Sequence, residues 1–215
     1  MTSAPPPARP LAAVLVLALA IACGSSLAGE KETDRIAEIL GVAPGARVAD
    51  VGAGDGEWSE DLARRVGPRG HVFATEIDAD DLDEIRDRLD KTGLDNHTVV
   101  QGEERDTGLP AGCCESILLR LVYHHFTDPA PMRASLHRSL RPGGLLAIVE
   151  IAPQTHWREL PGVPERGGHG ILPDRLVEEM TADGLFEVVG RHEEWPGDED
   201  HYCVVFRRLD TDPGT

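Results

Sequence analysis

The stretch Val48-Ala-Asp-Val-Gly-Ala-Gly-Asp-Gly-Glu57 decides the fold of this chain. Apolar and β-branched residues over 47–51 predict a short buried strand. Glycines follow at 52, 54 and 56, and an amphipathic run over 58–66 then predicts a helix. Glycine lets the backbone turn sharply and approach a ligand that a Cβ would block, and a helix N-terminus presents unpaired N–H groups. The order strand, glycine turn, helix therefore predicts a βαβ unit with a ligand at the turn.

The spacing of the glycines distinguishes between two classes of ligand. Dinucleotide-binding turns read G-x-G-x-x-G, whereas this turn reads G-x-G-x-G and is preceded by Asp50. A carboxylate there would repel a pyrophosphate but suits a ligand that carries an ammonium and a sulfonium. The motif resembles motif I of the class I S-adenosylmethionine-dependent methyltransferases, in particular the small-molecule enzymes of types 11 and 25. A nicotinamide-binding domain and a glycine-rich turn without a ligand remain as alternatives.

Length and charge narrow the class of protein. The chain has 215 residues, enough for one domain with a sizeable core. Its formal net charge of -17 argues against a nucleic-acid substrate, because the summed field would repel phosphates. The four cysteines have no metal-like spacing and form no disulfide framework.

Residues 1–23 resemble a bacterial leader. The apolar run over 11–23 is too short for a comfortable membrane span and has the length of the hydrophobic part of a signal peptide. It ends in a lipobox-like sequence with Cys23 as the candidate lipidated residue, although Ala20 stands where leucine is usual. Residues 24–30 would be a linker. Cleavage by an ordinary signal peptidase, an uncleaved tail and a misassigned start codon are the alternatives.

The leader and the expected donor point to different compartments. A signal or lipoprotein leader predicts the bacterial envelope, either the periplasm or attachment to a membrane through Cys23. S-adenosylmethionine is made in the cytoplasm, so methyl transfer predicts a cytoplasmic protein. The localisation therefore stays open.

Two further strand ends supply candidate ligands for an adenosyl group. The strand predicted over 70–76 ends in Glu76, about 20 residues after the glycine turn, where a carboxylate would accept both ribose hydroxyls. Ile77 would pack on the adenine. After the strand over 98–101 the resembled family usually has Gly-Asp, and this chain has Gly102-Glu103, so Glu103 would contact the adenine amino group. Glu104 is a rival for that role.

The segment after the strand predicted over 115–121 lies near the reacting centre by topology. Ligands of open α/β sheets bind beyond the carboxyl ends of the strands, where the strand order switches. Arg120, Tyr123, His124 and His125 are therefore expected there, and the histidine pair resembles a motif of small-molecule methyltransferases. One imidazole could be a general base, or it could simply cap the next helix or pack in the core. A metal site from His124, His125, His156 and His169 has no supporting spacing, so no metal is predicted.

The loop over 152–171 is long for a compact domain, which is typical of functional or disordered segments. We expect a lid over the substrate, with His169 as its most suggestive residue. A plain surface crossover is the alternative.

The remaining elements complete the predicted fold. Helices are predicted over 30–40, 78–94, 128–140 and 172–183, and strands over 145–150, 186–192 and 201–207. Arg141-Pro-Gly-Gly144 would turn into the fifth strand, and the last two strands would form an antiparallel hairpin. A plain dinucleotide-binding fold would continue with parallel strands instead.

The resemblance covers residues 31–208, followed by a tail over 209–215, and implies one α/β domain. The sheet would be Rossmann-like, seven-stranded and mostly parallel, with helices on both faces and an antiparallel last strand. The implied cofactor is S-adenosylmethionine, the implied reaction is methyl transfer, and a small-molecule acceptor is implied by the lack of a dedicated substrate domain. The implied cofactor-binding residues are Asp50, Gly52, Ala53, Gly54, Gly56, Glu76, Ile77, Glu103 and Arg120, and the candidate catalytic residues are His124, Tyr123 and His169.

Two rival functions come from other classes. A nicotinamide-dependent oxidoreductase would carry G-x-G-x-x-G and a parallel sixth strand. An envelope-anchored protein could keep the methyltransferase-like fold and only bind a ligand. The leader is the feature that favours this second rival.

Overall fold

A computed structural model describes residues 31–156, 161–196 and 200–210 of the chain. Several predictions fall outside the described residues: the leader over 1–23, its lipidation at Cys23, the linker over 24–30 and most of the tail over 209–215. In the part that is described, no helix is both long enough and apolar enough to cross a membrane.

The described elements match the predicted order of helices and strands. The helices are α1 (Glu32–Ile39), α2 (Glu57–Val66), α3 (Ala79–Lys91), α4 (Pro129–Ser139) and α5 (Pro173–Thr181), with short 3-10 turns η1 (Gly67–Arg69) and η2 (Tyr123–His125). The strands are β1 (Arg47–Val51), β2 (His71–Glu76), β3 (His97–Gln101), β4 (Cys114–Arg120), β5 (Leu140–Ile151), β6 (Phe186–His192) and β7 (His201–Arg208).

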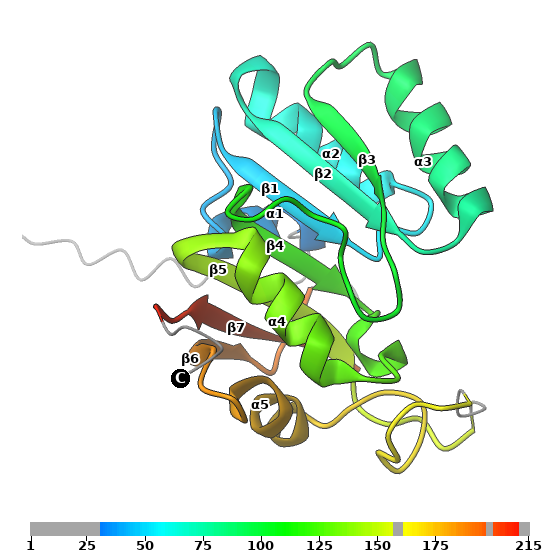
Figure 1. Cartoon of the computed structure of the whole chain (residues 1–215), viewed down its shortest axis with the longest axis vertical. Helices are drawn as coiled ribbons and strands as arrows, with labels where there is room; N and C mark the ends of the chain where they lie inside the picture. Colours follow the sequence, from blue (N-terminus) through cyan, green and yellow to red (C-terminus); the bar gives the residue numbers. More distant parts are fainter. Residues whose placement is uncertain (1–30, 157–160, 197–199, 211–215) are drawn as a thin grey trace, which may run out of the picture.

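The seven strands form one sheet in the order β3-β2-β1-β4-β5-β7-β6. Strands β1 to β5 pair in parallel, whereas β7 runs antiparallel to both of its neighbours, β5 and β6 (Figure 1). The predicted antiparallel hairpin at the end of the chain is therefore confirmed, and so is the mostly parallel seven-stranded sheet. Where a plain dinucleotide-binding fold would place a parallel sixth strand beside β5, this chain has the antiparallel β7.

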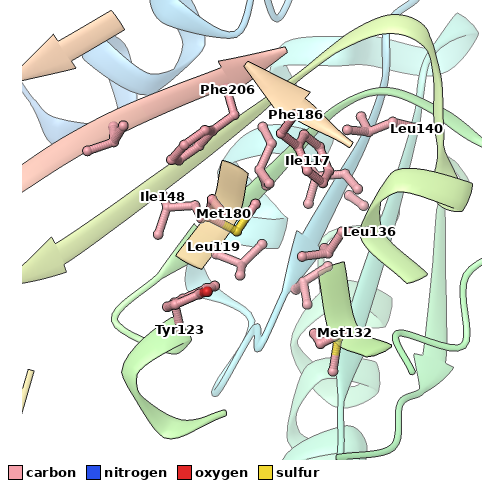
Figure 2. Packing of buried hydrophobic residues seen from close by; sticks show 14 of the residues in the cluster. Ile117, Leu119, Tyr123, Met132, Leu136, Leu140, Ile148, Met180, Phe186 and Phe206 are labelled. Carbon is pink, nitrogen blue, oxygen red and sulfur yellow. The ribbon is translucent and has the colours of Figure 1, made fainter. Parts of the chain in front are cut away.

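Helices cover both faces of the sheet because successive strand residues point to opposite sides. In β4, Ile117 and Leu119 belong to the core that includes residues of α4 and α5, while Leu118 belongs to the core that includes residues of α1 and α2. Figure 2 shows the first of these cores, where Leu136 of α4 and Phe186 of β6 lie among the strand side chains. Both faces are thus buried, as a parallel sheet requires.

The start of the fifth strand differs from the prediction. Arg141-Pro-Gly-Gly144 was expected to form a turn before the strand, but β5 already begins at Leu140, which pairs with Cys114. The register then shifts, so that Leu145 pairs with Ser116 and the intervening residues form an irregularity in the strand. A Cβ at Gly144 would lie 2.9 Å from the carbonyl oxygens of Arg141 and Glu115, which explains a glycine there.

The topology places one ligand site. From β1 the chain moves outward to β2 and β3, then returns across the sheet to β4, so the strand order switches between β1 and β4. The carboxyl ends of β1, β2, β3 and β4 meet at this switch point, where open α/β sheets bind their ligands.

Candidate active site

A cavity of about 590 Å³ lies at the switch point, within the size range of small-molecule sites. Its walls come from the ends of β1, β2 and β4, from the segments that follow β1 to β4, and from α4. The predicted cofactor residues among its lining are Gly52, Gly54, Glu76, Ile77, Glu103 and Arg120. The structure therefore gathers six of the nine residues that the sequence assigned to the cofactor.

Acidic side chains dominate the wall of this cavity. Arg120 is the one Lys or Arg residue among the lining residues, whereas six residues in the lining carry carboxylates: Glu76, Asp78, Asp81, Glu103, Glu104 and Asp106. Partial desolvation raises the pKa of Asp81, and so do the neighbouring Glu76, Asp78 and Asp80 carboxylates. Such a wall favours a cationic ligand and opposes a pyrophosphate.

The glycine turn carries three positive φ angles, 75° at Gly52, 53° at Gly54 and 79° at Gly56. A Cβ at Gly52 would lie 2.5 Å from the side chain of Val122, so this position is closed by packing. A Cβ at Gly54 would meet nothing within 4 Å, which leaves its backbone open to the cavity that it lines. Gly56 packs on Ile85 of α3 and is not part of the lining, and neither is Ala53.

Asp50 lies in the core beside the cavity rather than in its wall. Its side chain is buried and accepts a hydrogen bond from the Ser59 hydroxyl at 2.7 Å. Burial raises the pKa of Asp50 to about 6, against the opposing effect of the Ser59 hydrogen bond. The structure thus places this carboxylate against the first turn of α2 and outside the lining of the cavity.

Glu76 has the geometry expected of a ribose ligand. One of its carboxylate oxygens accepts from the Gly54 backbone N–H at 3.1 Å and the other from the Ile77 N–H at 2.7 Å. These bonds fix the carboxylate at the end of β2 and leave further lone pairs on its oxygens. Ile77 beside it is 56% exposed, which is unusual for isoleucine, and presents an apolar surface to the cavity that it lines.

Glu103 and Glu104 both line the cavity and are exposed, so the two rivals for the adenine contact are both placed within reach. The backbone of Glu103 is bonded to that of Asp106 in a tight turn, with its N–H donating at 2.7 Å.

Arg120 connects the cavity to α1. Its guanidinium pairs with Glu32 at 3.0 Å and lies 5.2 Å from the centre of the Trp58 ring. Glu32 also accepts a hydrogen bond from the Trp195 indole at 2.7 Å. The Glu32 carboxylate therefore offsets the positive charge of Arg120 and weakens its repulsion of a cationic ligand in the cavity.

Tyr123 follows β4 in η2, as expected, but is not among the residues that line the acidic cavity. It is fully buried, and its hydroxyl donates to Glu179 of α5 at 3.2 Å; Figure 2 shows its side chain with those of the buried hydrophobic cluster. Burial and the nearby Glu179 carboxylate raise the pKa of the Tyr123 hydroxyl. It does not line the cavity, so its placement favours packing over the expected contact with the methyl group.

A second cavity of about 320 Å³ adjoins the first. Its lining includes His124, His125, His156, His169, Asp200 and His201. Leu121 and His125 line both cavities, so the two share a wall. The histidines that the sequence singled out thus converge beside the acidic cavity.

His124 is held from both sides. Its Nδ1 lies 2.6 Å from Oε2 of Glu150, and its Nε2 lies 3.0 Å from Nε2 of His169. Glu150 is completely buried and also accepts from the backbone N–H of His124 at 3.1 Å. This arrangement fixes the orientation of the His124 ring as a catalytic or ligating imidazole requires.

His125 completes the cluster from the exposed side. Desolvation lowers its pKa to about 4, and the neighbouring His124 and His169 act in the same direction. His125 is therefore neutral at physiological pH, with a ring nitrogen whose lone pair is not taken up by a proton.

The loop after β5 is anchored at its base. The Gln154 and His169 backbones pair in an isolated bridge, and Gly168 packs against Gln154 so closely that a Cβ would lie 3.1 Å from its carbonyl. This pairing delivers His169 to the cluster. The segment over 157–160, part of the predicted lid, lies outside the described residues.

Two important residues escaped the sequence interpretation. Glu150, at the end of β5, and Glu32, in the first turn of α1, each bind a predicted site residue. A lone carboxylate at the end of an apolar strand is a usable signal for Glu150. No local signal marks Glu32, because its partner Arg120 is distant in the chain.

Residues 48–144 match the model of a family described as a methyltransferase domain. The ubiquinone/menaquinone biosynthesis C-methyltransferase of Vibrio cholerae is 31% identical over 113 residues, which is 52% of this chain and 44% of that protein. The protein of the same name from Teredinibacter turnerae is 33% identical over 116 residues, or 54% of this chain and 47% of that protein. The chain thus spans about half the length of the curated relatives that it matches.

Solved structures share the fold. An S-adenosylmethionine-dependent methyltransferase from Aquifex aeolicus has a TM-score of 0.68 at 22% identity, covering 82% of this chain and 89% of that one. The cyclase SpnF has a TM-score of 0.67 at 16% identity, covering 82% and 79%. The chain therefore shares the Rossmann-like fold of these solved structures, and its residues 48–144 are similar to a methyltransferase domain.

Proposed function

We propose that this protein transfers a methyl group from S-adenosylmethionine to a small-molecule acceptor. The observation that carries the proposal is the acidic cavity at the switch point, lined by six carboxylates and by one guanidinium that Glu32 already pairs. A sulfonium donor is cationic and is favoured by this wall, whereas the pyrophosphate of a nicotinamide cofactor is opposed. The glycine spacing supports the same choice.

The donor would lie along the ends of β1, β2 and β3. Glu76 accepts the ribose hydroxyls, and Ile77 and Glu103 face the adenine. The methionine end lies against the backbone of residues 52–56, with Asp50 as a supporting carboxylate. Arg120 borders the methyl group from β4.

The acceptor would enter the second cavity. His125 and Leu121 form the wall that both cavities share, so an acceptor among the histidines faces the donor across it. His124, oriented by Glu150 and in contact with His169, is the candidate for receiving the acceptor's proton. Sulfonium is a good leaving group, so most of the catalysis would come from aligning the two reactants for in-line displacement.

The relatives' names give a carbon acceptor in quinone biosynthesis. The chain spans only about half of those proteins, so the proposal names a small-molecule acceptor without naming the atom that receives the methyl group.

Calorimetry with S-adenosylhomocysteine tests the donor site. We expect Glu76→Gln to weaken binding by about 10–100-fold, because the variant loses a charged acceptor for the ribose hydroxyls. Glu84→Gln changes an exposed carboxylate of α3 that is not in the lining and should bind like the unmodified protein. Equal affinity in both variants, or tighter binding of NADH than of S-adenosylhomocysteine, would contradict the proposal.

One specific observation keeps a second candidate open, a ligand-binding protein without transferase activity. The cyclase SpnF shows that this fold also occurs in a protein whose name is not that of a methyltransferase. As a separate proposal, residues 1–23 direct such a protein to the envelope, with Cys23 as its anchor. Cell fractionation tests it: protein only in the envelope and without bound donor supports the binding function, and cytoplasmic protein contradicts export.

A further inference from the structure

Three imidazoles meet at one point outside the donor cavity. His124 and His125 come from η2, and His169 comes from the loop after β5. One ring nitrogen from each lies within 4.8 Å of the others. We propose that these three side chains form a binding site for a divalent transition-metal ion of the zinc type.

The separations suit such an ion after small movements. Zinc binds imidazole nitrogen at about 2.0–2.1 Å, so two ligands of a tetrahedral ion lie about 3.3–3.4 Å apart. The Nε2 atoms of His124 and His169 lie 3.0 Å apart, a few tenths of an ångström closer than that. His125 is exposed, so its ring can approach without disturbing the core.

Glu150 gives His124 the support that metal-bound histidines commonly have. A ligating imidazole usually donates its second N–H to a carboxylate, which fixes the tautomer and raises the basicity of the ligating nitrogen. The Glu150 carboxylate, 2.6 Å from Nδ1 of His124, can accept that proton and direct the Nε2 lone pair toward His169. Because Glu150 is completely buried and bonded to two backbone N–H groups, it holds the ring firmly.

The surroundings indicate an open site rather than a closed structural one. Three protein nitrogens leave a tetrahedral ion one position for another ligand, as in catalytic zinc sites. The cavity of about 320 Å³ provides the room. His201, which also lines it, has a buried Nδ1 with no hydrogen-bond partner among the described residues. Imidazole donors favour zinc, copper, nickel or cobalt over magnesium and calcium.

The position of the site suits a metal ion that binds the methyl acceptor. This role, unlike the metal site itself, rests on the proposed methyl transfer. His125 lies on the wall between the two cavities, so a hydroxyl or thiol acceptor on the ion would face the donor. A bound divalent ion lowers the pKa of such a group, and its proton then leaves to solvent. His124 would then act as a ligand and no longer as a free base.

Cobalt(II) titration of the chelator-treated full chain tests the site through the visible absorption of tetrahedral cobalt. We expect one ion per chain and its displacement by zinc. His125→Ala and His169→Ala should each weaken cobalt binding at least tenfold. Glu150→Gln should weaken it by about 10–100-fold, the range typical of carboxylates behind a ligand. His71→Ala is the matched control, because His71 starts β2 and bonds Thr98 instead.

The outcomes separate the metal site from the donor site. Cobalt binding lost in the cluster variants and kept in His71→Ala supports the proposal, provided that S-adenosylhomocysteine binding is unchanged in His169→Ala, because His169 does not line the donor cavity. Absence of tetrahedral cobalt in the unmodified chain overturns it, and so does equal binding in His125→Ala and His71→Ala. His125→Ala decides this even if buried substitutions fail to fold, since His125 is exposed. Metal binding without any S-adenosylhomocysteine binding would reject the proposed function alone.

Discussion

At the scale of the residue, Asp50 shows a charge kept at a cost to stability. Its pKa is raised from 3.8 to about 6, mainly by burial, so the folded state binds more protons than the unfolded state between these values. This carboxyl therefore makes the protein less stable as the pH rises from about 4 to 6, by about 2–3 kcal/mol in all. A neutral side chain at this buried position would avoid the cost of burying a charge.

Asp50→Asn should remove this pH dependence. The free energy of unfolding of the variant, compared with that of the unmodified protein, should rise by about 2–3 kcal/mol between pH 4 and pH 8. The amide's own hydrogen-bonding cost is the same at both pH values, so it cancels in the comparison. Urea unfolding at a series of pH values measures the difference, and two parallel stability curves would show that Asp50 ionises without penalty.

At the scale of the element, Glu32 ties α1 to the sheet and to the cavity. It pairs with Arg120 of β4 and accepts from Trp195, which lies between β6 and β7. Its side chain is 13% exposed and that of Arg120 is 29% exposed, so solvent screens the pair only partly. Three segments far apart in the chain are thus joined through one carboxylate.

Glu32→Gln should keep the indole hydrogen bond and lose the charge opposite Arg120. We expect a loss of about 1–2 kcal/mol in the free energy of unfolding. We also expect a several-fold weaker affinity for S-adenosylmethionine, because the unpaired guanidinium then repels the sulfonium. Glu38→Gln on the same helix is the control: that side chain is 68% exposed and pairs with Arg35 in the same turn, so its loss should stay below about 0.5 kcal/mol. Equal losses in the two variants would refute the role given to Glu32.

At the scale of the whole molecule, local patterns predicted the fold better than the contacts of the site. Hydrophobic periodicity and glycine turns predicted every strand, and the Pro196-Gly197 connection predicted the terminal hairpin. The early start of β5 was missed because its first pair, Leu140 with Cys114, depends on a neighbouring strand. The contact of Glu150 with His124 and that of Tyr123 with Glu179 of α5 were missed for the same reason, since both join residues distant in sequence.

The negative electrostatic field of the whole molecule should make the affinity for a cationic donor depend on salt. The formal net charge is -17, and the donor cavity concentrates carboxylates. S-adenosylmethionine carries one more positive charge than S-adenosylhomocysteine and is otherwise nearly the same shape, so the second ligand is a matched neutral control. Raising the ionic strength from about 0.01 to 0.5 M shortens the screening length from about 30 Å to below 10 Å. Calorimetry should then show the affinity for S-adenosylmethionine falling by about twofold to fivefold more than that for S-adenosylhomocysteine. Identical salt dependence of the two ligands would mean that the carboxylates do not recognise the sulfonium charge, and the choice of a cationic donor would lose its physical basis.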